Sequence, residues 1–480
     1  MSEDIVLINI TTKWPFAELG GFEKKSMGAY YVAAAIEKAG YTVNLYEHNL
    51  DYDLSYDEEI SAFTKFADSP AKLVGIGCHS VHLPFAVSVA RYLKEKCPEK
   101  VILLGGIGPS AVAVRLMEKF SFLDAVVIGE GEVTMAELVR NEAGDFEGIT
   151  GVVYRKDGVV YANELRKCAE VPDSLDGFDL SQVRIEKYQI PTVFTERGCP
   201  HNCTFCSAGD FWQQRLRSRS IESVIEELKQ LSIQKGLRRI FFGDSFFCYD
   251  KERVLSLCEA VRDECPDIKW ECIVQPELID EEMMKSMSDS GCESVFFGME
   301  TGSEYVGKKI RKNFSLDKSI SVIEKSVKYF KEARVRLIWG FPFEETEDFR
   351  KTMRIYNYIT GDIGYTVNLR WLEPYVNTSL YRQYRDTLFL PEEESSIFKP
   401  HLVKKMLKEE VADYKGTGNS SVNHKFLDIT NLRYISAAFH MAEIFGDLIK
   451  ENRDIFSDYY RYYTPGLEAK LDTVRECSIY

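Results

Sequence analysis

The sequence lacks a long apolar run, a stripe of basic residues, and an N-terminal segment with the charged, apolar and small-residue order of a signal peptide. Without about 18 consecutive apolar residues, we expect no transmembrane helix. Because phosphate binding depends on clustered Lys and Arg, the formal net charge of −15 argues against a nucleic-acid partner. The missing signal peptide predicts a protein of the reducing cytoplasm.

The composition is neither collagen-like nor that of a disordered chain. Its twelve cysteines are scattered through 480 residues, which is unlike a small secreted disulfide scaffold. With 45% hydrophobic residues, the chain can bury two or three packed domains. In bulk, this is the composition of an ordinary globular enzyme.

Three cysteines in the middle of the chain, Cys199, Cys203 and Cys206, form a CxxxCxxC pattern. Their thiolates can ligate three irons of a 4Fe-4S cluster and leave the fourth iron open to a chelating substrate. A structural zinc loop is the alternative, but zinc requires four ligands, and His201 lies inside the same tight loop. A buried strand at 190–195 precedes the cysteines and a helical pattern follows them, which is typical of barrels with catalytic loops at the strand ends.

The cysteine pattern, with Phe205 directly before the third cysteine, resembles the radical S-adenosylmethionine (SAM) superfamily. In that superfamily the open iron binds the amino and carboxylate groups of SAM. The resemblance implies a partial (β/α)6 TIM-like barrel over about 187–381. Its first strand is the one before the cysteines, and its later strands are expected at 239–243, 270–274, 294–298, 334–340 and 365–372.

The N-terminal third alternates short apolar strands with helical patterns, which predicts a doubly wound, Rossmann-like parallel sheet. The strands are expected at 4–10, 42–47, 73–78, 100–106 and 125–128. Ligands bind such sheets at the carboxyl ends of the strands, so loops 77–80, 105–110 and 129–132 should line a site. The first loop, 11–21, lacks GxGxxG, which disfavours a dinucleotide. A nucleotide or receiver-type domain remains the alternative.

Two of these loops, with Gly-Gly-x-x-Pro-Ser and Gly-Glu-Gly-Glu segments, resemble those of cobalamin-dependent radical SAM enzymes. The resemblance implies cobalamin-tail contacts from Gly105, Gly106, Ser110, Gly129 and Glu130. No Asp-x-His-x-x-Gly motif follows the first strand, so we expect base-off cobalamin without that histidine. The lower corrin face should meet the loop that holds Cys78, His79, Ser80 and His82, where cobalt ligation by either histidine stays open. His48 is expected to be a solvated loop residue.

Polar residues at the barrel strand ends are the SAM contacts that the resemblance implies, with turn or capping roles as the alternative: Asp244, Ser245, Glu300 and Arg336. The segment 340–346 resembles the family's Gly-x-Pro-x-Glu-Thr turn and is expected to be structural. Five further cysteines are interpreted as buried free thiols, with an auxiliary cluster as the alternative: Cys248, Cys258, Cys265, Cys272 and Cys292.

The predicted domains are a cobalamin-binding domain (1–145), a β-hairpin and linker (146–186), the radical SAM barrel (187–381) and a mostly helical C-terminal region (382–480). The resemblance implies C-methylation, in which a 5′-deoxyadenosyl radical abstracts hydrogen and methylcobalamin supplies the methyl group. Cyclisation or rearrangement without methyl transfer, and a cobalamin or redox sensor, are the alternatives. The implied partners are an electron donor such as flavodoxin or ferredoxin, and a small-molecule, peptide or protein substrate.

Overall fold

A computed structural model describes most of the chain between residue 3 and residue 384. The described ranges are 3–12, 23–50, 56–79, 82–142, 144–168, 189–312, 314–372 and 377–384, with isolated positions at 175, 178, 183–185 and 375. The predicted helical region at 382–480 lies outside the described residues, except for the three positions that end α15 (Ser379–Tyr384).

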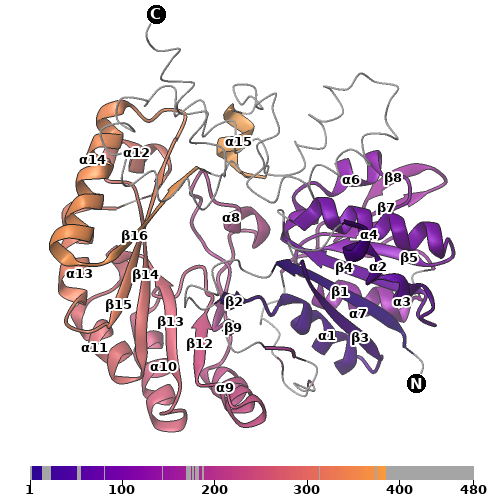
Figure 1. The fold of residues 1–480 in the computed structure, drawn as a ribbon, viewed down its shortest axis with the longest axis horizontal. Coiled ribbons are helices and arrows are strands. Elements are labelled where there is room, and N and C mark those ends of the chain that lie inside the picture. The colour runs from indigo at the N-terminus through magenta and orange to yellow at the C-terminus, as the bar shows by residue number, and fades with distance from the viewer. Residues whose placement is uncertain are drawn as a thin grey trace, which may run out of the picture.

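The N-terminal domain is built on a sheet whose described strands run in the order β3-β1-β4-β5-β6-β7-β8 (Figure 1). The first five strands of this order are parallel and confirm the predicted sheet: β1 (Ile5–Thr12), β3 (Val43–Leu50), β4 (Leu73–Cys78), β5 (Val101–Gly105) and β6 (Ala125–Val127). The chain leaves β1 for β3 on one side and returns to β4 on the other. The topological switch point, where ligands bind such sheets, therefore lies between β1 and β4.

Helices cover both faces of this sheet because alternate strand residues point to opposite sides. Ile5 and Leu7 belong to the core beneath α1 and α7, whereas Val6 and Ile8 pack with the other face. The helices of the domain are α1 (Gly28–Lys38), α2 (Tyr56–Ser61), α3 (Thr64–Ala67), α4 (Leu83–Lys96), α5 (Ile107–Ser110), α6 (Ala113–Lys119) and α7 (Glu132–Arg140).

The predicted hairpin forms from β7 (Val152–Lys156) and β8 (Val159–Ala162). Both residues of its tight turn have positive φ, 52° at Asp157 and 78° at Gly158, as a two-residue hairpin turn requires. β7 pairs antiparallel with β6, so the hairpin extends the N-terminal sheet. The expected boundary at residue 145 therefore cuts through a continuous sheet.

The second sheet is an open barrel with the strand order β16-β15-β14-β13-β12-β9-β2. Six parallel strands confirm the partial (β/α)6 barrel: β9 (Gln189–Val193), β12 (Arg239–Phe242), β13 (Lys269–Val274), β14 (Cys292–Glu300), β15 (Glu332–Trp339) and β16 (Thr366–Trp371). Figure 1 shows the long helices on the outside of these strands: α9 (Ile221–Lys235), α10 (Lys251–Glu264), α11 (Glu281–Asp289), α13 (Leu316–Ser326) and α14 (Thr346–Asn357). Short elements lie between them: β10 (Glu196–Arg197), α8 (Ala208–Phe211), β11 (Arg217–Ser218), η4 (Pro276–Leu278), α12 (Glu304–Lys309) and η5 (Tyr358–Ile363).

The seventh barrel strand, β2 (Glu23–Lys25), comes from the N-terminal domain and was not predicted. It pairs in parallel with β9, so that Lys25 lies opposite Pro191. The Lys25 ammonium group contacts Glu47 of β3 at 2.5 Å, and the Tyr30 hydroxyl donates to the same carboxylate at 2.6 Å. This strand therefore joins the two sheets.

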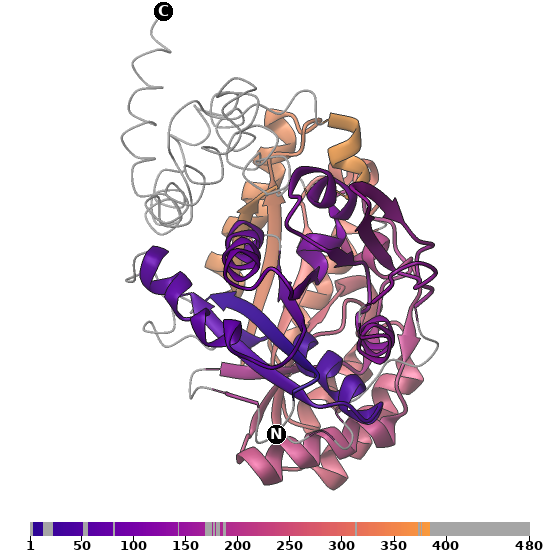
Figure 2. The ribbon, with the colours of Figure 1, turned by 90° about the vertical axis from the view of Figure 1, so that its right-hand side faces the viewer.

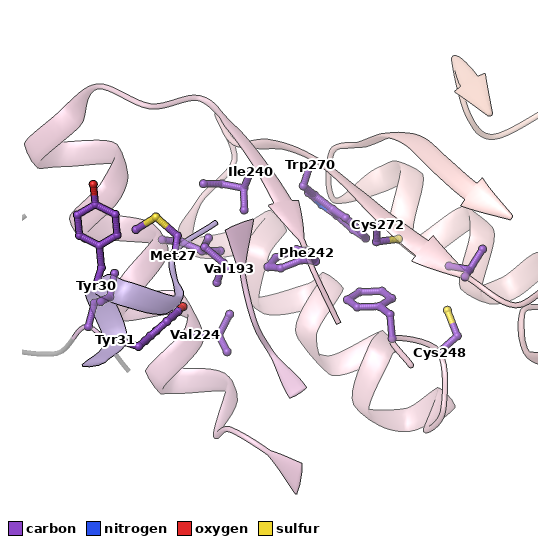
Figure 3. Close-up of a cluster of buried hydrophobic side chains, with 14 of the residues drawn as sticks. Met27, Tyr30, Tyr31, Val193, Val224, Ile240, Phe242, Cys248, Trp270 and Cys272 are labelled. Carbon is purple, nitrogen blue, oxygen red and sulfur yellow. The ribbon is translucent and has the colours of Figure 1, made fainter. Parts of the chain in front are cut away.

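The two domains also share one apolar core, which Figure 3 shows at its centre. Met27 and Tyr31 at the start of α1 pack with Val193 of β9 and Val224 of α9. The Tyr31 hydroxyl donates to the buried Glu227 carboxylate at 2.8 Å. Burial of each such apolar side chain contributes about 1.5–3 kcal/mol. In the turned view of Figure 2 the N-terminal sheet lies in front of the barrel, packed onto it.

Candidate functional site

The three cysteines of the CxxxCxxC pattern lie in one loop that follows β9 and β10. All three thiols are free. Burial raises the pKa of Cys203 to about 11; the Lys312 ammonium opposes this shift, while the thiols of Cys206 and Cys199 add to it. Among the described residues no three ligating side chains converge on the position of a single metal ion. Three free thiols in one loop are the kind of ligand that holds the irons of a 4Fe-4S cluster.

The backbone fixes this loop against the rest of the barrel. Gly198 has φ +100°, and a Cβ there would lie 1.8 Å from the carbonyl oxygen of Arg215, so only glycine fits. Within the loop, the Thr204 amide donates to the Ile310 carbonyl at 3.0 Å and the Thr204 carbonyl accepts from Leu380 at 2.9 Å. The cysteine positions are thus held from three separate parts of the domain.

A buried ion pair that the sequence did not predict lies beside the cysteines. Lys312 donates to the Gly298 carbonyl at 2.5 Å and to Glu300 Oε1 at 3.2 Å. Glu300 ends β14 with φ +72°, where the register with β15 shifts. Its Oε2 is buried without a hydrogen-bond partner, so it can accept from a ligand. Lys312 was missed because it lies among other Lys and Arg in a polar loop; its only signal is its position after the strand that carries Glu300.

The other predicted SAM contacts lie at the same edge of the barrel. Arg336 is exposed on β15. Burial raises the pKa of the Cys206 thiol, and the positive charge of Arg336 acts to lower it. Ser245 is exposed after β12. Phe205 packs edge-to-face on Phe341, with ring centroids 5.9 Å apart, and this contact joins the cysteine loop to a small apolar cluster.

Asp244 binds the backbone before the cysteine loop, as in the structural role that was the alternative to a SAM contact. Its side chain is fully buried, and its carboxylate accepts from the backbone amides of Thr195 and Glu196 at 2.8 and 3.1 Å and from the Thr195 hydroxyl. Burial raises the pKa of Asp244 to about 7. These bonds shape the chain just before the cysteine loop and leave the carboxylate without an exposed atom for a ligand.

The three glycine-bearing loops of the N-terminal sheet are adjacent at its carboxyl edge. Gly106, which follows Gly105 at the end of β5, has φ +96°, and a Cβ there would lie 2.8 Å from the Cys78 carbonyl oxygen of β4. The Ser110 hydroxyl accepts from the Gly129 amide at 3.1 Å, which joins the loops after β5 and β6. Gly129 has φ +77° and open space where a side chain would lie. At Gly129 a ligand can therefore approach the backbone of this sheet edge closely.

The loop expected beneath the corrin follows β4. Cys78 is buried at the strand end, His79 is exposed, and Ser80 lies outside the described residues. His82 is half-buried at the start of α4, where burial lowers its pKa to about 3 and keeps the imidazole neutral at physiological pH. Ligation of cobalt by either histidine stays a prediction.

The expectation for His48 is wrong. The residue lies within β3, is 6% exposed, and contacts the buried Glu59 carboxylate. Its ring stacks on Phe85 with centroids 5.6 Å apart. The sequence places it near a strand end, but α2 and α4 cover that end.

Glu130 lies in contact with the barrel domain. Its carboxylate binds Arg217 at 2.7 Å and Arg197 at 3.4 Å, and Glu132 binds Arg197 at 2.5 Å. Arg197 comes two residues before Cys199. The loop expected to hold cobalamin is therefore in direct contact with the chain that leads into the cysteine loop.

Two predicted structural features lie where expected. The cysteines at 248, 258, 265, 272 and 292 are buried with free thiols. In the segment 340–346, Glu344 accepts from the Gly340 and Phe341 amides, and Glu345 forms a capping box with Asp348 at the start of α14. Within the described part of the chain, no helix is long and apolar enough to cross a membrane.

Comparisons with known proteins match both domains of the chain. Residues 193–355 match the Radical SAM superfamily, and residues 20–139 match the B12 binding domain. An uncharacterized methyltransferase of Pyrococcus horikoshii is 28% identical over 385 residues, which cover 78% of this chain and 82% of that protein. The hopanoid C-3 methylase of Methylococcus capsulatus is 25% identical over 316 residues, which are 62% of this chain and 58% of the methylase.

Solved structures show the same fold. The methyltransferase TsrM of Kitasatospora setae, with cobalamin and a 4Fe-4S cluster bound, has a TM-score of 0.65 at 17% identity, covering 85% of each chain. OxsB, with aqua-cobalamin and SAM bound, has a TM-score of 0.64 at 16% identity, covering 96% of this chain and 75% of its own. The chain therefore combines a radical SAM domain with a B12-binding domain, whose cofactors are a 4Fe-4S cluster, SAM and cobalamin.

Proposed function

We propose that this enzyme is a cobalamin-dependent C-methyltransferase that acts on an unactivated carbon of a small molecule, peptide or protein residue. The observation that carries the proposal is the contact of Glu130 and Glu132 with Arg197. Through it, the loop assigned to cobalamin and the loop assigned to the cluster lie at one domain junction. Methyl transfer to a substrate radical needs both cofactors at one cavity.

The bound cofactors would supply a 5′-deoxyadenosyl radical for hydrogen abstraction and a methyl group carried on cobalt. The chain's own residues hold these groups and exclude water. Cys199, Cys203 and Cys206 would ligate three irons. Glu300 Oε2 would accept a hydrogen bond from SAM, and the exposed Arg336 would pair with its carboxylate. Asp244 would act indirectly, through the backbone amides that it binds before the loop.

The cobalamin tail would lie along the glycine edge of the N-terminal sheet, at Gly105, Gly106, Ser110 and Gly129. The positive φ of Gly106 and the open space beside Gly129 support this placement, because a side chain at either position would narrow the edge. The names of several relatives, a hopanoid methylase among them, support methyl transfer. We further propose that flavodoxin or ferredoxin reduces the cluster and that the enzyme works in the cytoplasm, where free thiols are maintained.

The test uses the anaerobically reconstituted full chain, SAM with an isotope-labelled methyl group, and candidate substrates. We expect mass spectrometry to find the label on a substrate carbon together with 5′-deoxyadenosine. Formation of 5′-deoxyadenosine with a changed but unlabelled product would instead indicate cyclisation or rearrangement. Tight binding of both cofactors without any turnover would indicate a sensor.

The state of cobalt is tested separately. We expect about one cobalamin per chain with the absorption spectrum of the base-off form, and a benzimidazole still bound to cobalt would contradict this. His79→Ala and His82→Ala test histidine ligation through the Co(II) electron paramagnetic resonance spectrum. An unchanged spectrum in both variants would leave the lower face without a histidine ligand.

A further inference from the structure

Four charged side chains, three of them buried and Glu130 nearly so, connect the two cofactor loops, and we call them the interdomain ion-pair cluster: Glu130, Glu132, Arg197 and Arg217. Their side chains are 11%, 9%, 4% and 3% exposed. Arg217 binds both oxygens of Glu130, at 2.7 and 3.0 Å, and Arg197 binds Glu132 at 2.5 Å and Glu130 at 3.4 Å. Two cations face two anions, so the cluster is electrically balanced.

The arrangement of this cluster is strongly constrained. Arg197 and Arg217 lie opposite each other on β10 and β11, so two guanidinium groups are buried side by side. The carboxylates of Glu130 and Glu132 in the other domain pair with both of them, and removal of either carboxylate would weaken the compensation of a buried charge. The Arg197 guanidinium also lies over the Tyr31 ring, 4.7 Å from its centroid. The paired geometry of charge-assisted bonds fixes orientation as well as distance.

Each side of the cluster continues directly into one cofactor loop. On the carboxylate side, Glu130 follows Gly129, whose amide binds Ser110, and Glu132 is the first residue of α7. On the guanidinium side, Arg197 is followed by Gly198, which is locked against Arg215, and then by Cys199. The Gly129–Glu132 loop is therefore connected to Cys199 by the Glu132–Arg197 ion pair and the short chain segment from Arg197 to Cys199.

We propose that the interdomain ion-pair cluster couples the two cofactor sites, so that cobalamin in the N-terminal domain tightens SAM binding at the cysteine loop. This inference rests on the proposed function, since it requires both cofactors to bind where we place them. Cobalamin contacts would restrict the Gly129–Glu132 loop and, through Arg197, the loop that carries the cysteines. SAM would then bind to a loop already ordered, which is positive coupling, and by linkage SAM would tighten cobalamin binding equally.

The experiment measures the SAM dissociation constant by anaerobic equilibrium dialysis of labelled SAM against the full chain with an oxidised cluster, with and without hydroxocobalamin. The oxidised cluster prevents turnover, so no substrate is needed. The coupling ratio is the SAM dissociation constant without hydroxocobalamin divided by the constant with it. We expect a coupling ratio of about five or more in the unaltered protein, which is within the range of known couplings. Glu132→Gln should bring the coupling ratio close to one while iron content stays unchanged.

Glu137→Gln is the matched control, because Glu137 lies on the same helix and pairs with Arg166 instead of the cluster arginines. It should keep the full ratio. If Glu132→Gln does not fold, Arg197→Lys reports on the same contact, since lysine keeps the charge but loses the paired donors. A coupling ratio of one in the unaltered protein would overturn the coupling. So would an unchanged coupling ratio in a folded Glu132→Gln or Arg197→Lys variant. Failure to bind SAM or cobalamin at all would overturn the proposed function itself.

Discussion

The Lys312 ammonium group binds the Glu300 carboxylate at 3.2 Å, and side-chain exposures of 6% and 10% leave the pair almost out of contact with solvent. The pair acts electrostatically on the Cys203 thiol. One carboxylate oxygen of Glu300 has a partner and the other has none. A buried acceptor left open in this way is costly unless a ligand satisfies it, which supports the proposed place of the pair in the SAM site.

Lys312→Met tests this assignment. The change leaves Glu300 buried without its cation, which should lower the free energy of unfolding by about 3 kcal/mol. It should also weaken SAM binding at least tenfold, because the carboxylate loses its fixed position, while the three cysteines still bind iron. Equilibrium dialysis and denaturation measure the two effects. The exposed Lys309→Met is the control, and SAM affinity unchanged in both variants would contradict the assignment.

The cysteine ligands are tested by iron and sulfide analysis after anaerobic reconstitution. The unaltered protein should hold about four irons per chain. Replacement of Cys199, Cys203 and Cys206 by Ala should remove the cluster and abolish 5′-deoxyadenosine formation. Cys258→Ala, which removes a buried free thiol in α10, should keep both. A full cluster in the triple variant would refute the assignment.

Gly106→Ala should impair cobalamin binding without affecting the iron cluster. The added Cβ would lie 2.8 Å from the Cys78 carbonyl oxygen, and φ +96° is strained for any other residue. The loops after β4 and β5 would separate, and we expect cobalamin affinity to fall about tenfold or more, equivalent to at least ~1.4 kcal/mol. Absorption titration measures the affinity. Gly361→Ala, where a Cβ meets open space, provides the control; equal affinities would contradict the placement of the tail.

Glu344 should make the stability of the fold depend on pH. Burial raises its pKa to about 8, so the folded protein retains a proton that the unfolded chain releases near pH 4.5. The carboxyl therefore destabilises the fold progressively as pH rises from about 4.5 to about 8. Glu344→Gln cannot ionise, so its stability relative to the unaltered protein should increase by about 2–4 kcal/mol between pH 5 and pH 8.

Urea denaturation of the cofactor-free protein at the two pH values measures this difference. The half-exposed Glu347→Gln, in the same helix start, should show no comparable pH trend. A Glu344→Gln variant whose relative stability is the same at both pH values would contradict the raised pKa.

The sequence predicted the parallel strands of both domains well because local signals specify them. Apolar runs of four to eight residues separated by helical patterns indicate a βα repeat, and parallel strands bring the following loops to one edge. The same logic located the cysteine loop and the glycine loops. It also identified Glu300 as a strand-end residue, since the apolar strand before it is clear from the sequence.

What the sequence could not predict depends on contacts between distant segments. β2 has the sequence Glu-Lys-Lys, which carries no strand signal, and it is defined by pairing with β9 some 160 residues later. The Arg partners of Glu130 and the burial of Asp244 and His48 likewise depend on tertiary packing. Each of these residues is polar, so its pattern alone favoured solvent or a ligand.

The pairing of β2 with the edge of the barrel sheet has a consequence for how this gene can be divided. A fragment that begins after the N-terminal domain would lack the strand that covers β9, and its barrel would expose an open sheet edge prone to aggregation. It would also lose the α1 side chains that complete the barrel core. The cobalamin module is thus an architectural part of the barrel, and recombination of such modules between genes would have to preserve this short crossing strand.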